Sequence, residues 1–191
     1  MIKPHLYLDT CIFLDAIYNR RDASKQLLAK AKHEVKQGNW LCSTSRWTML
    51  ELLDTMQEEL FVKNLRIDNM RWSHISRKLH TRRQQAAGLQ KTELDSIWNT
   101  LRNKITKDYS FIEFKYPKNV AMWDEAEDIC GGTNLSPEDS LHLAAAMEIG
   151  CNILVTTDQD FIAIANQYVK YIRTVPPSEV DTAIAKLNVE F

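Results

Sequence analysis

Short apolar runs alternate with longer segments of helical periodicity along this chain of 191 residues. Few of these runs alternate apolar with polar positions, which is expected when helices cover both faces of a sheet. We therefore predict an α/β fold with three layers, α/β/α, around a central, mainly parallel sheet. The runs that predict its strands are HLYLD (5–9), WLCST (40–44), YSFIEFKYP (109–117), CNILVTT (151–157) and VKYIRTV (169–175).

The helical segments lie between and after these runs. The segment 136–150 has the clearest ends, because Ser136 suits the N-cap, Pro137 the first turn and Gly150 the residue after the last turn. Ser43, Thr44 and Ser45 are candidate caps for a helix over 45–61. Further helices are predicted from Thr10 onward and over 23–38, 119–132, 158–167 and 177–188.

From about residue 58 to residue 108 the chain becomes polar and rich in lysine and arginine, with Gly88 as its clearest break. We predict a single domain over 1–191 with this segment as a basic helical insertion. One interpretation is an RNA-phosphate surface with stacking side chains, with candidate contacts Arg77, Lys78, Arg82 and Arg83. A second is a solvated helix face that packs inward through Leu65, Ile67, Trp72, Ile75 and Leu79. A third is a surface for a protein partner.

Composition limits the class of protein. The formal net charge is −1, so any contact with nucleic acid must come from a local basic patch. The four cysteines form no CxxC pair and match no zinc spacing, which favours buried free thiols in a reducing compartment. The sequence has no membrane-spanning stretch, and its first ten residues lack a signal-peptide pattern, so we expect a cytoplasmic protein.

Three acidic side chains are predicted to converge. Asp9 and Asp158 end two predicted strands, and Asp139 lies in the first turn of a predicted helix. Each one alone could be a helix cap. Strand ends and the helix starts that follow them share one rim of a parallel sheet, however. Crowded carboxylates repel one another and are costly to desolvate, and a bound cation would relieve both effects. Oxygen ligands favour Mg²⁺ or Mn²⁺.

Three stretches carry a family resemblance: LYLDTCIFLDA (6–16), MLELLD (49–54) and SPEDSLHLAAAMEIGCNILVTTDQDF (136–161). They resemble motifs of the PIN domain, which implies a metal-dependent endoribonuclease that leaves a 5′-phosphate and a 3′-hydroxyl. The resemblance implies a catalytic quartet of Asp9, Glu51, Asp139 and Asp158. Its metal ligands would be Asp9, Asp139 and Asp158, with Asp160, Thr10 and Thr157 beside the site.

Two of these positions have other interpretations. Glu51 could belong to a solvated stripe with Asp54 and Glu58, which follow it at helical spacing. His142 lies one helical turn after Asp139, and it could be a catalytic base or a side chain packed beside the site.

The resemblance extends to VapC-like ribonuclease toxins. It implies an RNA substrate and an antitoxin-like protein partner, and a homodimer is common in the family. The insertion makes this chain longer than compact toxins, so a toxin and a stand-alone processing enzyme both remain open. The alternative function is a catalytically silent PIN-like module that binds RNA or protein. The intact quartet argues against that alternative.

Overall fold

A computed structural model describes residues 2–67, 70–85, 88–116 and 119–187, and for 67 and 81–85 it describes the backbone alone. The chain forms two compact units. The first unit contains Met1–Thr48 and Tyr109–Phe191, and the second contains Met49–Asp108.

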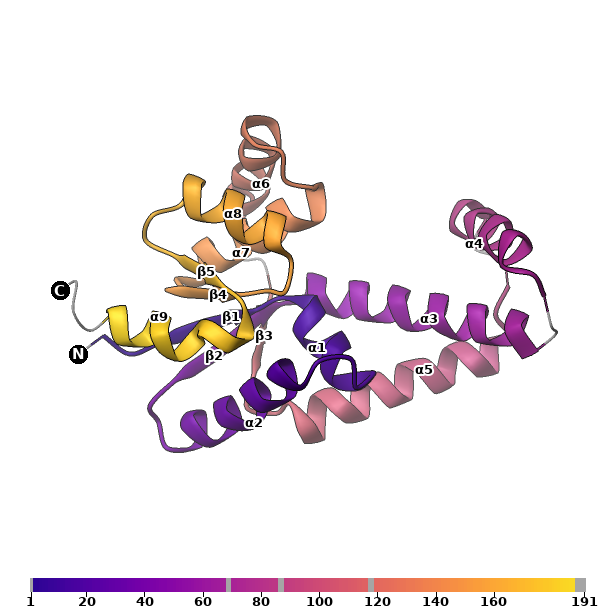
Figure 1. The fold of residues 1–191 in the computed structure, drawn as a ribbon, viewed down its shortest axis with the longest axis horizontal. Helices are drawn as coiled ribbons and strands as arrows, with labels where there is room; N and C mark the ends of the chain where they lie inside the picture. Colours follow the sequence, from indigo (N-terminus) through magenta and orange to yellow (C-terminus); the bar gives the residue numbers. More distant parts are fainter. Residues whose placement is uncertain (1, 68–69, 86–87, 117–118, 188–191) are drawn as a thin grey trace. The chain divides into compact units, whose positions relative to one another are not determined.

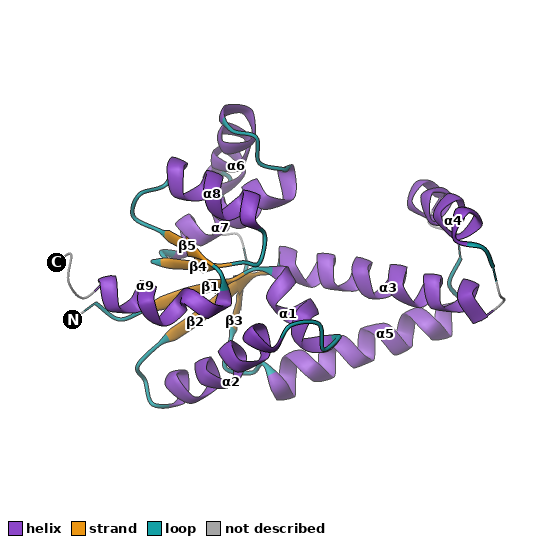
Figure 2. Ribbon diagram, viewed as in Figure 1, coloured by secondary structure: helices purple, strands orange, loops and turns teal. Residues whose placement is uncertain are grey.

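The first unit is built on a parallel sheet of five strands in the order β3-β2-β1-β4-β5 (Figures 1 and 2). β1 lies at the centre and pairs with β2 and β4, so that Leu8 is opposite Val155. The predicted α/β/α fold with a parallel sheet is confirmed. The strand bounds are β1 His5–Leu8, β2 Leu41–Ser45, β3 Glu113–Lys115, β4 Ile153–Val155 and β5 Arg173–Val175.

Helices cover both faces of this sheet (Figure 1). One face carries α1 (Thr10–Ile17), α2 (Asp22–Lys36) and α9 (Val180–Leu187), which follows a 3-10 turn at Pro177–Glu179. The other face carries α6 (Ala121–Gly132), α7 (Pro137–Ile149) and α8 (Gln159–Tyr168). The connection that follows β1 leads toward the β3 edge of the sheet, and the connection that follows β4 leads toward the β5 edge. Because such connections are right-handed, their helices lie on opposite faces of the sheet.

Apolar burial between α6, α7, α8 and the sheet forms one core of the first unit. Tyr7, Leu143 and Phe161 are almost completely buried there. Cys42 and Cys151 are buried and Cys11 and Cys130 are half-buried, and all four are free thiols, as predicted. None of the described helices is both long enough and apolar enough to cross a bilayer.

The ends of α7 confirm the prediction made from its sequence. Ser136 Oγ accepts a hydrogen bond from the Asp139 amide at 3.0 Å, Pro137 lies in the first turn, and Gly150 adopts a left-handed φ of 77°. The predicted caps of the helix after β2 are wrong. The hydroxyls of Ser43 and Thr44 bond to residues of β1, and Ser45 Oγ is buried with no hydrogen-bond partner among the described residues.

Two predicted strands are much shorter in the structure. The run 109–117 begins with a turn closed by a hydrogen bond from the Ile112 amide to the Tyr109 carbonyl, so β3 starts only at Glu113. The Val169 amide donates a hydrogen bond to the Ala165 carbonyl at the end of α8. The predicted strand 169–175 therefore begins in the cap of α8, and β5 starts only at Arg173. Apolar side chains in these turns are buried without belonging to a strand.

The second unit contains most of α3 (Trp47–Ile67), α4 (Trp72–Gln85), α5 (Lys91–Asn103) and a π-helical turn at Lys104–Asp108. The segment predicted to be a helical insertion contains parts or all of these three helices, and Gly88 lies in the break before α5 at a φ of 124°. The inward packing is confirmed for the buried Leu65 and Ile75 and the partly buried Leu79. It is wrong for Trp72, which is 61% exposed. The side chain of Ile67 lies outside the described residues.

Candidate active site

Asp9 lies directly after β1 and caps α1, and its side chain is buried. Its Oδ1 accepts a hydrogen bond from the Thr10 amide at 2.6 Å. Its Oδ2 accepts one from Thr156 Oγ1 at 2.6 Å and one from Cys11 Sγ at 3.1 Å. Burial and the nearby Asp9 carboxylate raise the pKa of Cys11, so its thiol keeps the proton that it donates. These donors fix the orientation of the Asp9 carboxylate.

His142 lies beside Asp9 in a buried hydrogen-bonded chain. Its Nε2 is 3.4 Å from Asp9 Oδ1 and 3.3 Å from Thr10 Oγ1, and its Nδ1 is 2.8 Å from the Tyr7 hydroxyl. A neutral imidazole with its proton on Nε2 satisfies all of these contacts, because the Tyr7 hydroxyl then donates to Nδ1. In this arrangement His142 helps to hold the Asp9 carboxylate in one orientation, as residues hydrogen-bonded to a metal ligand commonly do.

Asp139 lies in the first turn of α7 and is half-buried. Its Oδ2 accepts a hydrogen bond from Ser136 Oγ at 2.9 Å. Burial and the negative charges of Asp9 and Asp158 raise the pKa of Asp139, against the opposing effects of Ser136 and His142. The three aspartates therefore act on one another electrostatically, as expected for side chains that converge on one rim of the sheet.

Asp158 follows β4 and caps α8. Its Oδ1 accepts hydrogen bonds from the amides of Asp160 at 2.9 Å and Phe161 at 3.0 Å. Its own amide donates to Thr156 Oγ1 at 3.2 Å, so Thr156 links Asp158 to Asp9. The side chains of Asp158 and Asp160 are exposed. The structure thus supports the capping interpretation and the convergence of the acids at the same time.

Several polar residues of this cluster were absent from the sequence prediction: Tyr7, Cys11, Ser136 as a partner of the carboxylate, and Thr156. The sequence match indicated the hydroxyl of Thr157, but it is Thr156 that donates to Asp9, whereas the Thr157 amide bonds to Cys11 Sγ at 3.2 Å. The two adjacent threonines in NILVTTD (152–158) are the sequence feature from which a hydroxyl beside Asp9 could have been predicted. Only the pairing of β1 with β4 decides which of them is beside Asp9.

The donor chemistry of the three aspartates fits a hard cation held partly through water. Within the described residues, no three His, Cys, Asp or Glu side chains form a group that could hold a metal ion directly. The hydrogen bonds of Asp139 use Oδ2 and those of Asp158 use Oδ1, which leaves one oxygen of each without a donor from the described residues. Mg²⁺ commonly binds through one or two carboxylates and keeps several waters.

Glu51, the fourth acidic residue of the predicted quartet, lies on α3 in the second compact unit. It is half-buried and has an interaction partner, whereas Asp54 is exposed. The three aspartates belong to the first unit.

The profile of the PIN domain matches residues 6–167, which is most of the chain. The chain belongs to the PIN domain family. The resemblance found in the sequence is therefore confirmed. PIN domains are generally nucleases, so membership indicates a hydrolase of phosphodiester bonds. No curated protein matches the chain in sequence.

Solved structures resemble this PIN domain in fold. One is a chain of the crystal structure of VapBC2 from Rickettsia felis bound to a DNA fragment from their promoter. The TM-score is 0.51 at 15% sequence identity, and the match covers 90% of this chain and 98% of that chain. At this identity the likeness supports the fold.

Proposed function

We propose that this PIN domain is a metal-dependent endoribonuclease that hydrolyses RNA phosphodiester bonds at Asp9, Asp139 and Asp158. The observation that carries the proposal is the hydrogen-bonded link from Asp9 through Thr156 to Asp158 at the rim of the sheet. Asp139 is close enough to them that their charges add to the effect of burial, which is the main cause of its raised pKa. Neighbouring carboxylates that disfavour one another's charge are what a cation-binding site requires. Family membership adds the nuclease class.

In this proposal Asp9, Asp139 and Asp158 hold Mg²⁺ or Mn²⁺, directly or through water. The bound cation would lower the pKa of the attacking water and offset negative charge on the scissile phosphate. Thr10, Cys11, Thr156 and His142 keep Asp9 in one orientation through the hydrogen bonds described above. Asp160 and Thr157 lie beside the site, and the family resemblance alone assigns Glu51 the role of orienting the attacking water.

Removal of divalent cations is expected to abolish cleavage. A fluorescent single-stranded RNA should remain intact with the protein in excess EDTA, and millimolar Mg²⁺ or Mn²⁺ should restore its hydrolysis to 5′-phosphate and 3′-hydroxyl ends. Asp139→Asn protein, purified in parallel, controls for contaminating nucleases. Cleavage by the wild type that persists in EDTA and is absent from the Asp139→Asn preparation would contradict the metal dependence of the proposal.

We further propose that the basic insertion contacts the RNA. The Arg66 guanidinium lies over the Trp72 ring at 5.6 Å from its centroid, and the Trp72 side chain is 61% exposed. Arg77 and Lys78 are exposed on α4, while the side chains of Arg82 and Arg83 lie outside the described residues. An exposed indole among cations is suited to stacking on an RNA base.

Trp72→Ala is expected to weaken binding of single-stranded RNA by about 1–3 kcal/mol, the usual contribution of one stacked base. Little stability should be lost, because most of the Trp72 side chain is already in solvent. Fluorescence anisotropy with a labelled oligonucleotide measures the effect. Trp98→Ala is the matched control, since Trp98 is also exposed and lies on α5 of the same unit. Equal RNA affinity of the two variants would count against a specific role for Trp72.

A toxin role with an antitoxin-like partner is the second form of this proposal. It rests on the VapC-like motifs and on the fold likeness to a VapBC2 chain. A protein encoded by an adjacent gene should then copurify with this chain and inhibit cleavage. An active enzyme with no such neighbour would indicate a stand-alone processing nuclease.

A further inference from the structure

Arg46 and Tyr116 form a stacked pair at the rim of the sheet that carries the aspartates. Arg46 directly follows β2, and Tyr116 directly follows β3. Ser45 pairs with Lys115, and the Arg46 amide donates a hydrogen bond to the Lys115 carbonyl at 2.8 Å. The two residues therefore leave the carboxyl ends of neighbouring parallel strands. Asp9 leaves the carboxyl end of the next strand, β1, at the same rim.

The Arg46 guanidinium lies over the Tyr116 ring, with its Cζ 4.5 Å from the ring centroid. Both residues are exposed, and the exposed fraction of Tyr116 is 66%. None of the described acidic side chains forms an ion pair with Arg46, whereas the neighbouring Lys115 is paired with Glu113 at 2.6 Å. The pair thus offers a ligand an aromatic ring and a guanidinium that no described carboxylate neutralises.

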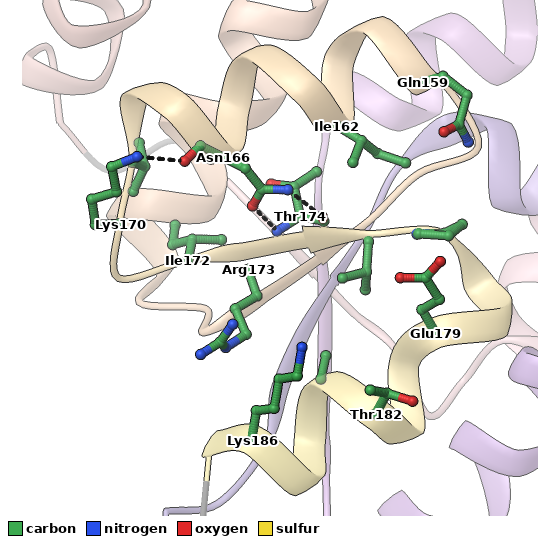
Figure 3. A pocket seen from close by; sticks show the side chains of 14 residues that line it. Gln159, Ile162, Asn166, Lys170, Ile172, Arg173, Thr174, Glu179, Thr182 and Lys186 are labelled. Atoms are coloured by element: carbon green, nitrogen blue, oxygen red, sulfur yellow. Dashed lines mark hydrogen bonds between the residues drawn. The ribbon is translucent and has the colours of Figure 1, made fainter. Parts of the chain in front are cut away.

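The two ends of this rim differ in charge. Toward β5, Asp158 is followed by Gln159, which lines a pocket of about 440 Å³ between α8, β5 and α9. Figure 3 shows Gln159 and Glu179 at one end of this pocket. The cations that line the pocket lie at its other end, on Lys170, Arg173 and Lys186. An anionic strand that crosses the rim toward β5 thus meets acidic side chains first, whereas toward β3 it meets Arg46 and Tyr116.

We propose that Arg46 and Tyr116 form a subsite for an unpaired nucleotide of the RNA, next to the scissile phosphate. The proposal rests on the ribonuclease function proposed above. The planar guanidinium donates hydrogen bonds to two oxygens of one phosphate group, and the Tyr116 ring stacks on the base. The base must be unpaired, because a base within a duplex is stacked on its neighbours and its face is not accessible.

The spacing of the strands sets the distance between this subsite and Asp9. Neighbouring strands lie about 5 Å apart, so the backbones of Arg46 and Tyr116 start roughly 5 and 10 Å from β1 along the sheet. A cluster of aspartates repels the RNA backbone, so affinity must come from cations elsewhere on the protein. A cation and a ring beside the acids hold the strand where its neighbouring phosphate can reach them.

The test compares two double variants with closely matched changes at opposite rims of the sheet. The subsite variant combines Arg46→Gln with Tyr116→Leu. The control variant combines Lys3→Gln with Tyr171→Leu, because Lys3 lies before β1 and Tyr171 lies before β5. Tyr171 is 65% exposed, which matches Tyr116. Binding of a fluorescent single-stranded RNA is measured by anisotropy in EDTA, which prevents metal-dependent cleavage.

The subsite variant is expected to bind single-stranded RNA at least ~10-fold more weakly than the wild type, since one stacked base alone accounts for about 5- to 150-fold. Its salt slope should fall by about 0.7, the contribution of one phosphate contact on a single strand. The control variant should bind as the wild type does, and all four replaced side chains are exposed, so both variants should keep the wild-type thermal midpoint. Equal RNA affinity of the wild type and the subsite variant would overturn the proposal and leave the pair as a surface for an acidic protein partner.

Single variants separate the two contributions and keep the test valid if the double variant unfolds. Tyr116→Phe should keep the wild-type affinity, because the ring remains. Tyr116→Leu should weaken binding of single-stranded RNA and leave the affinity for a fully paired RNA duplex unchanged. An equal loss of affinity for both RNAs in Tyr116→Leu would contradict a subsite for an unpaired nucleotide.

Cleavage is scored in a separate assay with Mg²⁺. The subsite variant should have a raised KM and an almost unchanged kcat, because the contact is made equally in the ground state and the transition state. Absence of all cleavage by the wild type would refute the nuclease function, and the anisotropy result would still decide whether RNA occupies the subsite.

Discussion

Asp9→Asn is expected to lower the rate of metal-dependent RNA cleavage by about 100- to 1,000-fold, the usual effect of removing one electrostatic element of a site. The substitution keeps the size of the side chain and removes its charge. The asparagine carbonyl can still accept the hydrogen bond from the Thr10 amide, so the cap of α1 is kept. The amide nitrogen would face Thr156 Oγ1, which can accept a hydrogen bond as well as donate one.

The matched control for this variant is Asp15→Asn. Asp15 is also buried on the first unit, where it accepts a hydrogen bond from Ser24 Oγ at 3.0 Å and lies 3.8 Å from Arg21. The same chemical change is thus made away from the three aspartates. We expect the control to keep the wild-type rate and the Asp9 variant to keep a cooperative thermal melt. Full activity of a folded Asp9→Asn protein would exclude the proposed site.

Asp139→Asn is expected to raise the thermal midpoint of the metal-free protein at pH 7. The pKa of Asp139 in the folded state is raised above its ordinary value of 3.8. Between these two pKa values the folded state binds more protons than the unfolded state, so the free energy of unfolding falls as the pH rises through them. Above both values the folded protein carries the full cost of the charged carboxylate. The variant lacks that cost, and its advantage should disappear below about pH 4.

Divalent cations should reverse the order of the two thermal midpoints, so that the wild type melts at the higher temperature. A ligand present at 100 times its Kd stabilises the folded state by about 2.7 kcal/mol. We therefore expect Mg²⁺ to raise the melting temperature of the wild type and to have much less effect on Asp139→Asn. Glu138→Gln is the control, because Glu138 is the exposed neighbour in the same first turn of α7. A wild-type midpoint that does not respond to millimolar Mg²⁺ or Mn²⁺ would contradict a shared cation site.

The convergence of the aspartates could be predicted because it depends on topology. A parallel sheet places every strand end at one rim, which holds for Asp9 and Asp158, and α7 runs antiparallel to the strand β4 that follows it, so its first turn with Asp139 is expected at the same rim. The same three residues also cap or begin α1, α7 and α8. The two interpretations of each acid were therefore compatible, since a cap places a carboxylate at the rim.

The partners of these acids could not be predicted, because they depend on register and packing between distant segments. Tyr7 and His142 are far apart in sequence, and their contact requires α7 to lie across β1. The choice of Thr156 over Thr157 follows from the pairing of Leu8 with Val155. The apolar content of these segments also made the predicted β3 and β5 too long. The reason is that apolar residues before each strand are buried in turns, namely Tyr109, Ile112, Val169 and Ile172.

The helical character of the segment from about 58 to 108 was predicted, and its details differ. Lysine and arginine content identified a polar helical segment. The exposure of Trp72 could not be predicted, because tryptophan side chains are usually buried. The long α3 carries Glu51 from the end of the first unit into the second. The pocket between α8, β5 and α9 was not predicted, because its cations come from three separate elements.

Crystals soaked in Mn²⁺ and measured at a wavelength that excites the metal test most directly whether these acids share a cation. We expect an anomalous peak about 2.0–2.6 Å from a carboxylate oxygen of Asp139 or Asp158, with Asp9 bound directly or through one water. The peak should be absent from crystals of Asp139→Asn. Full occupancy of Mn²⁺ elsewhere, with only ordered water between the three carboxylates, would contradict the cation site and leave the aspartates as helix caps.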